Sequence, residues 1–216
     1  PSSNRIMKSL VLLVPLLALA AAGRVSVREK IPDFLVPGSC PVVDEKALWA
    51  EQKPNHSKYA GRWFEVALSK NAFQLVKQCT KSDLTYNNNG FDHITTGLDQ
   101  SGNPIRREGV TFEFTTGANR ETPHLSIQFE QPSFASPYVI LDTDYDNYSC
   151  IYSCTDFNGD FVSDWLFVWS RSSTLDAQYM DKCLVAYRKL GLDVNRLEKV
   201  TQGSGCDYEG QDSLLL

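Results

Sequence analysis

The sequence has little of what nucleic-acid-binding proteins, metalloenzymes and serine hydrolases need. Its 21 lysines and arginines against 26 aspartates and glutamates give a net charge of -5, so we expect no basic surface that follows a phosphate backbone. Its three histidines lie in no H-E-x-x-H spacing, and no serine occupies a nucleophile elbow. The sequence therefore predicts no nucleic-acid partner, no metal site and no catalytic residue.

The sequence also lacks an apolar run long enough for a membrane span. The run Leu10–Ala22 is shorter than the roughly 20 residues that a spanning helix needs, and it contains Pro15. Because it follows Met7-Lys8 and ends in small residues, the pattern is typical of a secretory signal peptide. We expect residues 1–6 to be leader, residues 7–22 to be the signal peptide, and the mature protein to be secreted, extracellular and without a membrane span.

Secretion takes a chain through an oxidising compartment, where the six cysteines would most simply form three disulfides. Cys150 and Cys154 lie in a segment that we predict to be a strand, which places their Cα atoms roughly 13 Å apart. A disulfide needs Cα atoms within about 7 Å, so each of the two must bond a distant cysteine. The composition alone leaves the pairing open.

One motif near these cysteines weakly resembles a metal site. Asp142, Asp144 and Asp146 imitate the first half of a calcium loop, but the glycine and glutamate of its second half are replaced by Asn147 and Ser153. We therefore do not expect calcium to bind.

The sequon for N-glycosylation occurs at Asn55-His56-Ser57 and at Asn147-Tyr148-Ser149. A sequon can also be an unused match, and for the first one both outcomes stay open. The second coincides with the start of a predicted buried strand, where a glycan is less expected.

Short β-rich runs separated by turn signals such as Asn89-Gly90 and Asn158-Gly159 follow an N-terminal segment at 30–59, which includes a short helical stretch at 44–50. Several runs alternate apolar and polar residues, as in residues 125–129, which is typical of a sheet wrapped around an interior. The runs predict strands at 62–68, 79–86, 91–98, 107–114, 124–129, 138–142, 148–153 and 165–170.

The apolar period becomes helical after residue 173, and Gly191 follows as a stop signal. The residues that recur at this spacing are Leu175, Tyr179, Cys183, Tyr187 and Leu190. The sequence therefore predicts an all-β fold: an eight-stranded antiparallel up-and-down barrel with one C-terminal α-helix packed outside.

Three segments in this order resemble the signature of the lipocalin family: Gly61-Arg62-Trp63, Thr143-Asp144-Tyr145 and Arg171. The resemblance implies a lipocalin domain at 30–206. We expect the segment beyond Cys206, residues 207–216, to be a flexible tail. The resemblance also implies structural roles for Gly61, Trp63, Thr143, Asp144, Tyr145 and Arg171. In that family the tryptophan closes the barrel floor and the arginine stacks over it.

Within the lipocalins, "KIPDFLVPGSC", "YAGRWFEVAL", "TPHLSI" and "YSCIYSC" are similar to the C-type crustacyanin subunits, a carotenoid-binding branch of the family. This resemblance implies the disulfides Cys40–Cys154, Cys79–Cys206 and Cys150–Cys183. It implies an extracellular carrier in shell or epidermal tissue that binds astaxanthin in the barrel and red-shifts its absorption. It also implies a heterodimer with an A-type subunit and higher assembly. The interface candidates, for which local packing is the alternative, are the aromatic residues Phe34, Phe73, Phe134 and Tyr138.

The same resemblance nominates ligand-binding residues. Gln74 and His124 would hydrogen bond an end-ring oxygen, and Ser82 and Thr95 lie where the family presents small polar groups. The alternative for His124 is a hydrated histidine at a strand start. We expect the apolar lining to include Leu84, Tyr86, Phe112, Phe114, Ile127 and Phe129.

Two residues depart from the family pattern, because Glu65 stands where relatives tend to have glutamine and Ser82 where asparagine is expected. A buried carboxylate without a partner is costly, so Glu65 either faces a donor or points to the rim. Two alternatives to a carotenoid carrier remain: a carrier of another hydrophobic small molecule (a bilin, retinoid or fatty acid), or an isomerase with a reactive thiol in its cavity.

Overall fold

The computed structural model describes residues 35–44, 55–70, 74–88, 90–114, 124–130, 135–157 and 159–213. All of them belong to a compact unit that spans residues 32–216. The expected signal peptide and the turn residues Asn89 and Asn158 lie outside the described residues. The helical stretch predicted at 44–50 also lies outside them, apart from Asp44.

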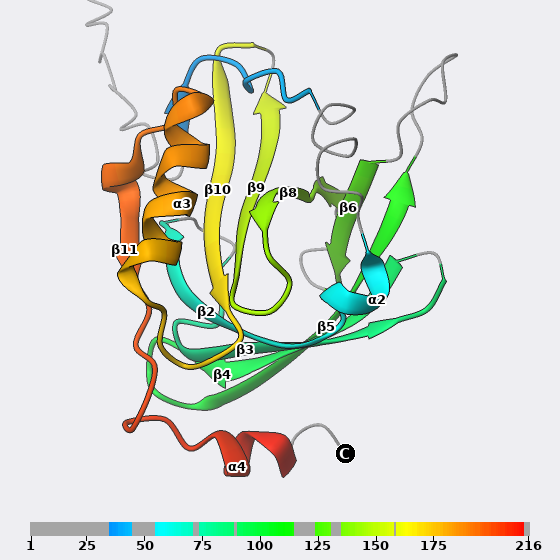
Figure 1. Cartoon of the computed structure of the whole chain (residues 1–216), viewed down its shortest axis with the longest axis vertical. Helices are drawn as coiled ribbons and strands as arrows, with labels where there is room; N and C mark the ends of the chain where they lie inside the picture. Colours follow the sequence, from blue (N-terminus) through cyan, green and yellow to red (C-terminus); the bar gives the residue numbers. More distant parts are fainter. Residues whose placement is uncertain are drawn as a thin grey trace, which may run out of the picture. The chain divides into compact units, whose positions relative to one another are not determined.

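One antiparallel sheet forms the barrel, in the strand order β7-β6-β5-β4-β3-β2-β10-β9-β8 (Figure 1). Its two ends, β7 and β8, follow each other in the chain with Tyr138 between them, so the barrel is nearly closed. The short strands β1 and β11 pair with β10 and β2. The bounds are β1 Val36–Pro37, β2 Gly61–Ser69, β3 Gln78–Tyr86, β4 Gly90–Leu98, β5 Pro104–Phe114, β6 His124–Phe129, β7 Ala135–Pro137, β8 Val139–Thr143, β9 Tyr148–Phe157, β10 Phe161–Ser170 and β11 Leu197–Lys199.

The predicted fold class is confirmed, since β2 to β6 and β8 to β10 overlap the eight predicted strands. β9 and β10 are longer than expected because their antiparallel pairing continues as far as Phe161 opposite Phe157. The strands β1, β7 and β11 were not predicted, because segments of two or three residues are too short to show an alternating pattern.

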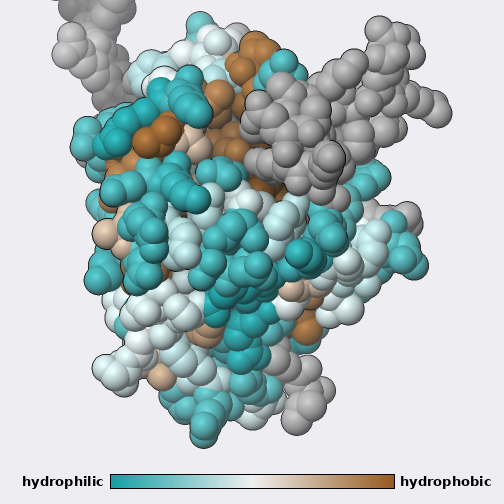
Figure 2. All heavy atoms as spheres, viewed as in Figure 1, coloured by the Kyte–Doolittle hydropathy of each residue, from teal (hydrophilic) through white to brown (hydrophobic). Residues whose placement is uncertain are grey.

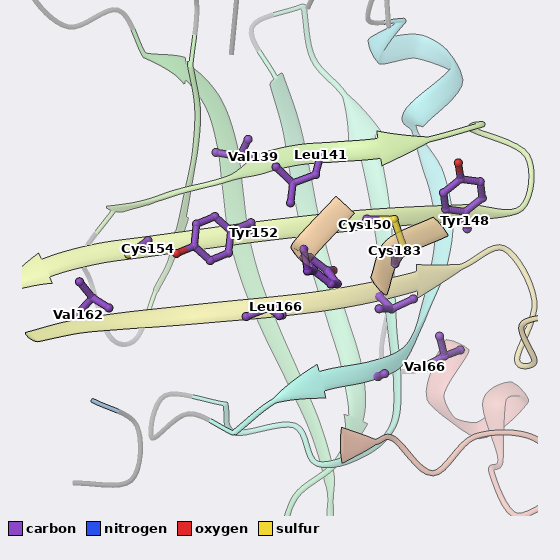
Figure 3. Packing of buried hydrophobic residues seen from close by; sticks show 13 residues of the cluster. Val66, Val139, Leu141, Tyr148, Cys150, Tyr152, Cys154, Val162, Leu166 and Cys183 are labelled. Atoms are coloured by element: carbon purple, nitrogen blue, oxygen red, sulfur yellow. A yellow bond between two sulfur atoms is a disulfide. The ribbon is translucent and has the colours of Figure 1, made fainter. Parts of the chain in front are cut away.

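Helix α3 (Ala177–Lys189) packs on the outside of the barrel, as predicted. Cys183 and Tyr187 are its buried residues, and the Tyr187 hydroxyl donates to the backbone oxygen of Phe167 at 2.6 Å. They join the outward-facing residues of β8, β9 and β10, among them Leu141, Tyr152 and Leu166, in one apolar cluster (Figure 3). Gly191 follows the helix with φ +74°, a conformation that glycine adopts without strain.

Three disulfides hold the outer parts of the chain to the barrel. Cys40 is bonded to Cys154 and Cys150 to Cys183, which ties β9 to the N-terminal segment and to α3. The third joins Cys79 to Cys206. These are the pairs that the family resemblance implied, and Cys150 and Cys154 each bond a distant cysteine, as the strand geometry required.

The C-terminal segment, expected to be a flexible tail at 207–216, contains helix α4 (Tyr208–Asp212). The Asp212 carboxylate pairs with Arg62 at 2.7 Å and with the buried Lys81 ammonium, which also lies 3.7 Å from Asp83. A buried ammonium needs such partners, because desolvation of an unpaired charge is costly. The helix is too short for sequence periodicity to show, which is why the prediction missed it.

Helix α2 (His56–Tyr59) and the 3-10 helix η1 (Val194–Arg196) complete the described elements. On the face that Figure 2 shows, hydrophilic residues predominate, as expected of the outside of a barrel whose apolar residues turn inward. Among the described residues, no helix is long and apolar enough to cross a membrane.

Candidate ligand-binding cavity

One end of the barrel is closed by α2 and a tryptophan–arginine pair. The Arg171 guanidinium carbon lies 3.7 Å from the centroid of the Trp63 ring, a cation–π contact. The same guanidinium donates hydrogen bonds to the backbone oxygens of Tyr145 at 2.9 Å, Arg62 at 2.8 Å and Lys58 at 2.8 Å. The Trp63 indole donates to the backbone oxygen of Tyr59 at 2.8 Å, so this end is a plug held by hydrogen bonds from side chains to the backbone.

Of the three aspartates that imitate a calcium loop, Asp142 belongs to β8, and Asp144 and Asp146 lie beside this plug in the turn between β8 and β9. Asp144 Oδ1 accepts from the backbone N–H of Asn147 at 2.8 Å, and also from those of Asp146 and Tyr148. Partial burial opposes its charge, but these hydrogen bonds outweigh that effect and lower the pKa of Asp144. Its oxygens therefore hold a turn, and no metal-binding cluster of His, Cys, Asp or Glu occurs among the described residues.

A cavity of about 70 Å³ lies inside the barrel, away from the plug. Its walls come from β2, β3, β4, β5, β6, β7, β9 and β10, together with the connection between β2 and β3. The lining is largely apolar and aromatic, with a few polar groups. The residues are Glu65, Gln74, Val76, Ser82, Thr95, Arg107, Ile127, Phe129, Ser136, Tyr138, Ser153, Trp165, Phe167 and Trp169.

Glu65 is the buried carboxyl group of this cavity, with 4% of its surface exposed. It faces a donor, because Gln74 Nε2 donates to its Oε1 at 2.9 Å. Burial raises the pKa of Glu65 to about 8, while the Trp169 indole and Lys77 act in the opposite direction. At neutral pH the group is therefore mostly a neutral carboxylic acid that keeps a proton to donate.

Other polar groups on the wall differ in whether they have partners. Ser82 and Thr95, opposite each other on β3 and β4, share a hydrogen bond at 2.9 Å. Ser136 Oγ is buried and has no hydrogen-bond partner among the described residues. The buried Trp169 indole faces the Glu65 carboxyl, whose pKa it lowers. Because an unpaired buried polar atom is costly, Ser136 Oγ suits a ligand that supplies a polar group.

His93 is a buried histidine of the interior that was not among the predicted ligand-binding residues. Its Nε2 shares a hydrogen bond with Thr111 Oγ1, and its ring lies 6.1 Å from that of Tyr138 and 6.4 Å from that of Trp169. Burial lowers the pKa of His93 to about 3, so the ring is neutral near pH 7. The signal was present in the sequence, since His93 shares a strand face with Thr95.

Arg107 brings a positive charge to the cavity wall. Its guanidinium carbon lies 4.3 Å from the centroid of Phe129, and burial lowers the pKa of this arginine. An arginine remains charged in proteins, so the group can pair with an anionic ligand group.

Five of the ten residues predicted to bind ligand line the cavity: Gln74, Ser82, Thr95, Ile127 and Phe129. Leu84 and Tyr86 do not, because they follow Ser82 toward the closed end of β3, where Leu84 packs with Trp63 and the Tyr86 ring lies 5.8 Å from that of Phe91. The side chains of Phe114 and His124 lie outside what the structure describes.

Phe112 lies outside the cavity walls for a different reason. Thr111 turns inward to His93, and successive side chains of a strand point to opposite faces, so Phe112 faces outward.

Tyr138 was an interface candidate with local packing as the alternative, and the structure shows local packing. Only 3% of its surface is exposed, since its ring lines the cavity and its hydroxyl contacts that of Tyr59 at 3.1 Å. The other interface candidates, Phe34, Phe73 and Phe134, lie outside the described residues. All six cysteines are in disulfides, so the cavity has no thiol for the isomerase alternative.

Comparisons with known proteins agree with this geometry. The Crustacyanin-C1 subunit of Homarus gammarus is 44% identical to this chain over 186 residues, which are 86% of this chain and 100% of that protein. The Crustacyanin-A1 subunit of the same species is 43% identical over the same shares of each chain, so these comparisons do not separate the two subunit types. A solved structure of apocrustacyanin C1 matches with a TM-score of 0.78 and 44% identity, covering 85% of this chain and 99% of that one.

A model of the Lipocalin / cytosolic fatty-acid binding protein family matches residues 60–204. This range contains every described barrel strand from β2 to β10, the cavity, the closing pair Trp63 and Arg171, and helix α3. The barrel, its external helix and the family match all lead to one conclusion: the chain belongs to the lipocalin family.

Proposed function

We propose that this chain is a secreted carrier that binds astaxanthin in the barrel cavity and shifts its absorption to longer wavelength, for coloration. One observation carries the proposal: an apolar, aromatic cavity whose wall holds the Glu65 carboxyl, which keeps its proton, and the buried Ser136 hydroxyl, which has no hydrogen-bond partner among the described residues. A carotenoid with oxygens on its end rings supplies both an apolar body and polar ends. The similarity to the crustacyanin subunits along nearly the whole chain supports the same ligand class.

The cavity fits one end of such a ligand. Its volume of about 70 Å³ is well below the roughly 300 Å³ at the lower end of sites that enclose a drug-sized ligand. A long polyene would therefore place one end ring inside, and the rest would leave the barrel. Each buried Å² of apolar surface contributes about 25 cal/mol, so the polyene outside the barrel gains from a second protein that covers it.

This requirement for a cover supports a heterodimer. We propose that an A-type crustacyanin subunit is the partner of this chain, which would then act as the C-type subunit, and that the pair assembles further. The exposed apolar residues Leu75, Val110 and Phe157 are available to such contacts.

The colour shift would come from hydrogen-bond donors at the keto oxygen of the end ring. Glu65 holds its proton near neutral pH because burial raises its pKa to about 8, so its neutral acid can donate while Gln74 fixes the other oxygen. A donor at this oxygen pulls electron density along the conjugated chain and lowers the excitation energy. His124, nominated by the resemblance, is a second proposed donor.

A hydrophobic ligand with a carboxylate, such as a fatty acid or an acidic retinoid, is the second candidate. The observation that favours it is Arg107, a charged guanidinium in the cavity wall that is partly buried over Phe129. A charge-assisted pair between guanidinium and carboxylate is stronger than a neutral hydrogen bond. A neutral carotenoid cannot form this pair, so competition between the two ligand types separates the candidates.

Tryptophan fluorescence tests the site, because Trp165 and Trp169 line the cavity. Astaxanthin should quench the tryptophan fluorescence of the refolded protein, and the quenching should saturate when each barrel holds one end ring. Palmitate should not displace the bound astaxanthin. Ser153→Leu, which fills the cavity wall, should weaken binding at least tenfold, whereas the matched change Ser101→Leu in an exposed turn should not. Equal quenching of both variants would show that the ligand binds elsewhere, and displacement by palmitate would favour the carboxylate ligand.

A further inference from the structure

The two N-glycosylation sequons of this chain lie in very different environments. Both offer an asparagine amide followed two residues later by a serine hydroxyl, Asn55 with Ser57 and Asn147 with Ser149. A glycan on a folded protein must extend into solvent, and its attachment must leave the local hydrogen bonds intact. The surroundings of the two amide nitrogens can therefore be compared directly.

Asn55 meets both requirements. The residue and Ser57 are exposed, and Asn55 is the N-cap of α2. Its Oδ1 accepts from the backbone N–H of Lys58 at 3.1 Å and from the Ser57 hydroxyl at 2.7 Å. Both bonds use the oxygen, so a sugar on Nδ2 would leave the helix cap in place.

Asn147 meets neither requirement. It is half-buried in the β8–β9 turn, and its Nδ2 donates to Asp144 Oδ2 at 2.8 Å. Its backbone is also held on both sides, since the N–H donates to Asp144 Oδ1 and the C=O accepts from the Arg171 N–H at 3.0 Å. The sequon hydroxyl, on Ser149, is fully buried and bonds the Tyr59 hydroxyl at 2.8 Å.

The position of Asn55 also separates it from the ligand. It lies at the closed end of the barrel, where its backbone N–H donates to the Tyr145 hydroxyl at 3.1 Å. Three residues later, the backbone oxygen of Lys58 accepts a hydrogen bond from the Arg171 guanidinium. The cavity lies further along the barrel, and Gln74, which lines it, is in the connection after the far end of β2. A glycan on Asn55 would leave the cavity unobstructed and would keep the closed end out of any tight protein interface.

We propose that the secreted protein carries one N-linked glycan, on Asn55, and none on Asn147. The donor is an oligosaccharide on a polyprenyl diphosphate. The amide nitrogen of Asn55 attacks the anomeric carbon, a C–N bond forms, and the C–O bond to the diphosphate breaks. The polyprenyl diphosphate leaves with the bonding electrons and the amide nitrogen loses one proton, so no oxidant or reductant is needed.

Intact-mass spectrometry of the full chain, expressed in insect cells and collected from both medium and cell extract, tests the proposal. Treatment with peptide N-glycosidase should remove one oligosaccharide from the wild-type protein and convert Asn55 to aspartate. Asn147→Gln should lose the same mass. Ser57→Ala, which removes the sequon while keeping the capping asparagine, should lose none.

Two results would overturn the proposal: a wild-type mass that the glycosidase does not change, or a glycan that persists in Ser57→Ala and disappears in Asn147→Gln. Asn55→Gln provides a second variant, with the cap weakened and the sequon removed. The glycan test is independent of the proposed carotenoid binding, because astaxanthin should quench the tryptophan fluorescence of Ser57→Ala as it does that of the wild type.

Discussion

Replacing the buried acid Glu65 by glutamine should change how the stability of the protein depends on pH. The pKa of Glu65 rises from its ordinary value of 4.5 to about 8 on folding, chiefly because burial penalises the charged form. The folded state therefore holds a proton that the unfolded state releases between these pH values. The stability that Glu65 confers is fully present below pH 4.5 and is lost as the pH rises toward 8.

The size of the effect follows from the same two values. The gap between 4.5 and about 8 corresponds to a loss of about 5 kcal/mol once the folded group is ionised, of which about 3 kcal/mol is lost by pH 7. Glutamine has nearly the same shape and can still accept the hydrogen bond from Gln74, but it does not titrate. Glu65→Gln should therefore match the wild type near pH 4.5 and exceed its stability by about 3 kcal/mol at pH 7.

His93 makes the comparison with a variant necessary, because its contribution has the opposite sign. Burial lowers the pKa of His93 from 6.5 to about 3, so its share of the stability is complete above pH 6.5 and is lost as the pH falls toward 3. In the wild type the two slopes partly cancel between pH 4.5 and 6.5. The difference between wild type and Glu65→Gln removes the histidine contribution, which both proteins share.

Urea unfolding followed by tryptophan fluorescence at pH 4.5, 6, 7 and 8 measures the difference, with unchanged m-values as the check that both proteins unfold alike. The difference in unfolding free energy should grow steadily with pH. Parallel curves across this range would refute the reasoning, since they would mean that Glu65 has an ordinary pKa and is hydrated in the folded protein.

Two further changes test the scaffold. Arg171→Ala should lower the free energy of unfolding in urea by about 2–4 kcal/mol, because it removes the cation–π contact with Trp63 and four hydrogen bonds to backbone oxygens. Arg171→Lys should recover only part of this loss, and a loss below about 1 kcal/mol in Arg171→Ala would contradict the role of the plug. The double change Cys150→Ala with Cys183→Ala opens a loop with a sequence separation of 33 and should cost about 4 kcal/mol; calorimetry showing an unchanged melting temperature would contradict that.

The barrel could be predicted from the sequence because most of its strands show local alternation of apolar and polar residues or are bounded by turn signals. The alternation in β6 and the turn signals between strands are local features, and α3 shows helical spacing over its whole length. The disulfide pairs came from the family resemblance. Strand geometry alone showed only that Cys150 and Cys154 must bond distant partners.

The cavity was harder to predict, because inward direction depends on register. Phe112 was placed inside, although the inward residue of this part of β5 is Thr111. The register of the pairing between β10 and β2 shifts between Val168 and Trp169, and no pattern of residues in the sequence predicts this irregularity. Short elements such as α4, which covers Lys81, depend on tertiary contacts that periodicity cannot show.

The most direct test of the carotenoid proposal is a titration of the refolded protein with astaxanthin, alone and with an A-type crustacyanin subunit, while the visible spectrum is recorded. The account predicts saturable binding and an absorption maximum that moves to longer wavelength, with a larger shift when the partner covers the rest of the polyene. Absence of binding, or binding with an unshifted spectrum even in the presence of the partner, would contradict it.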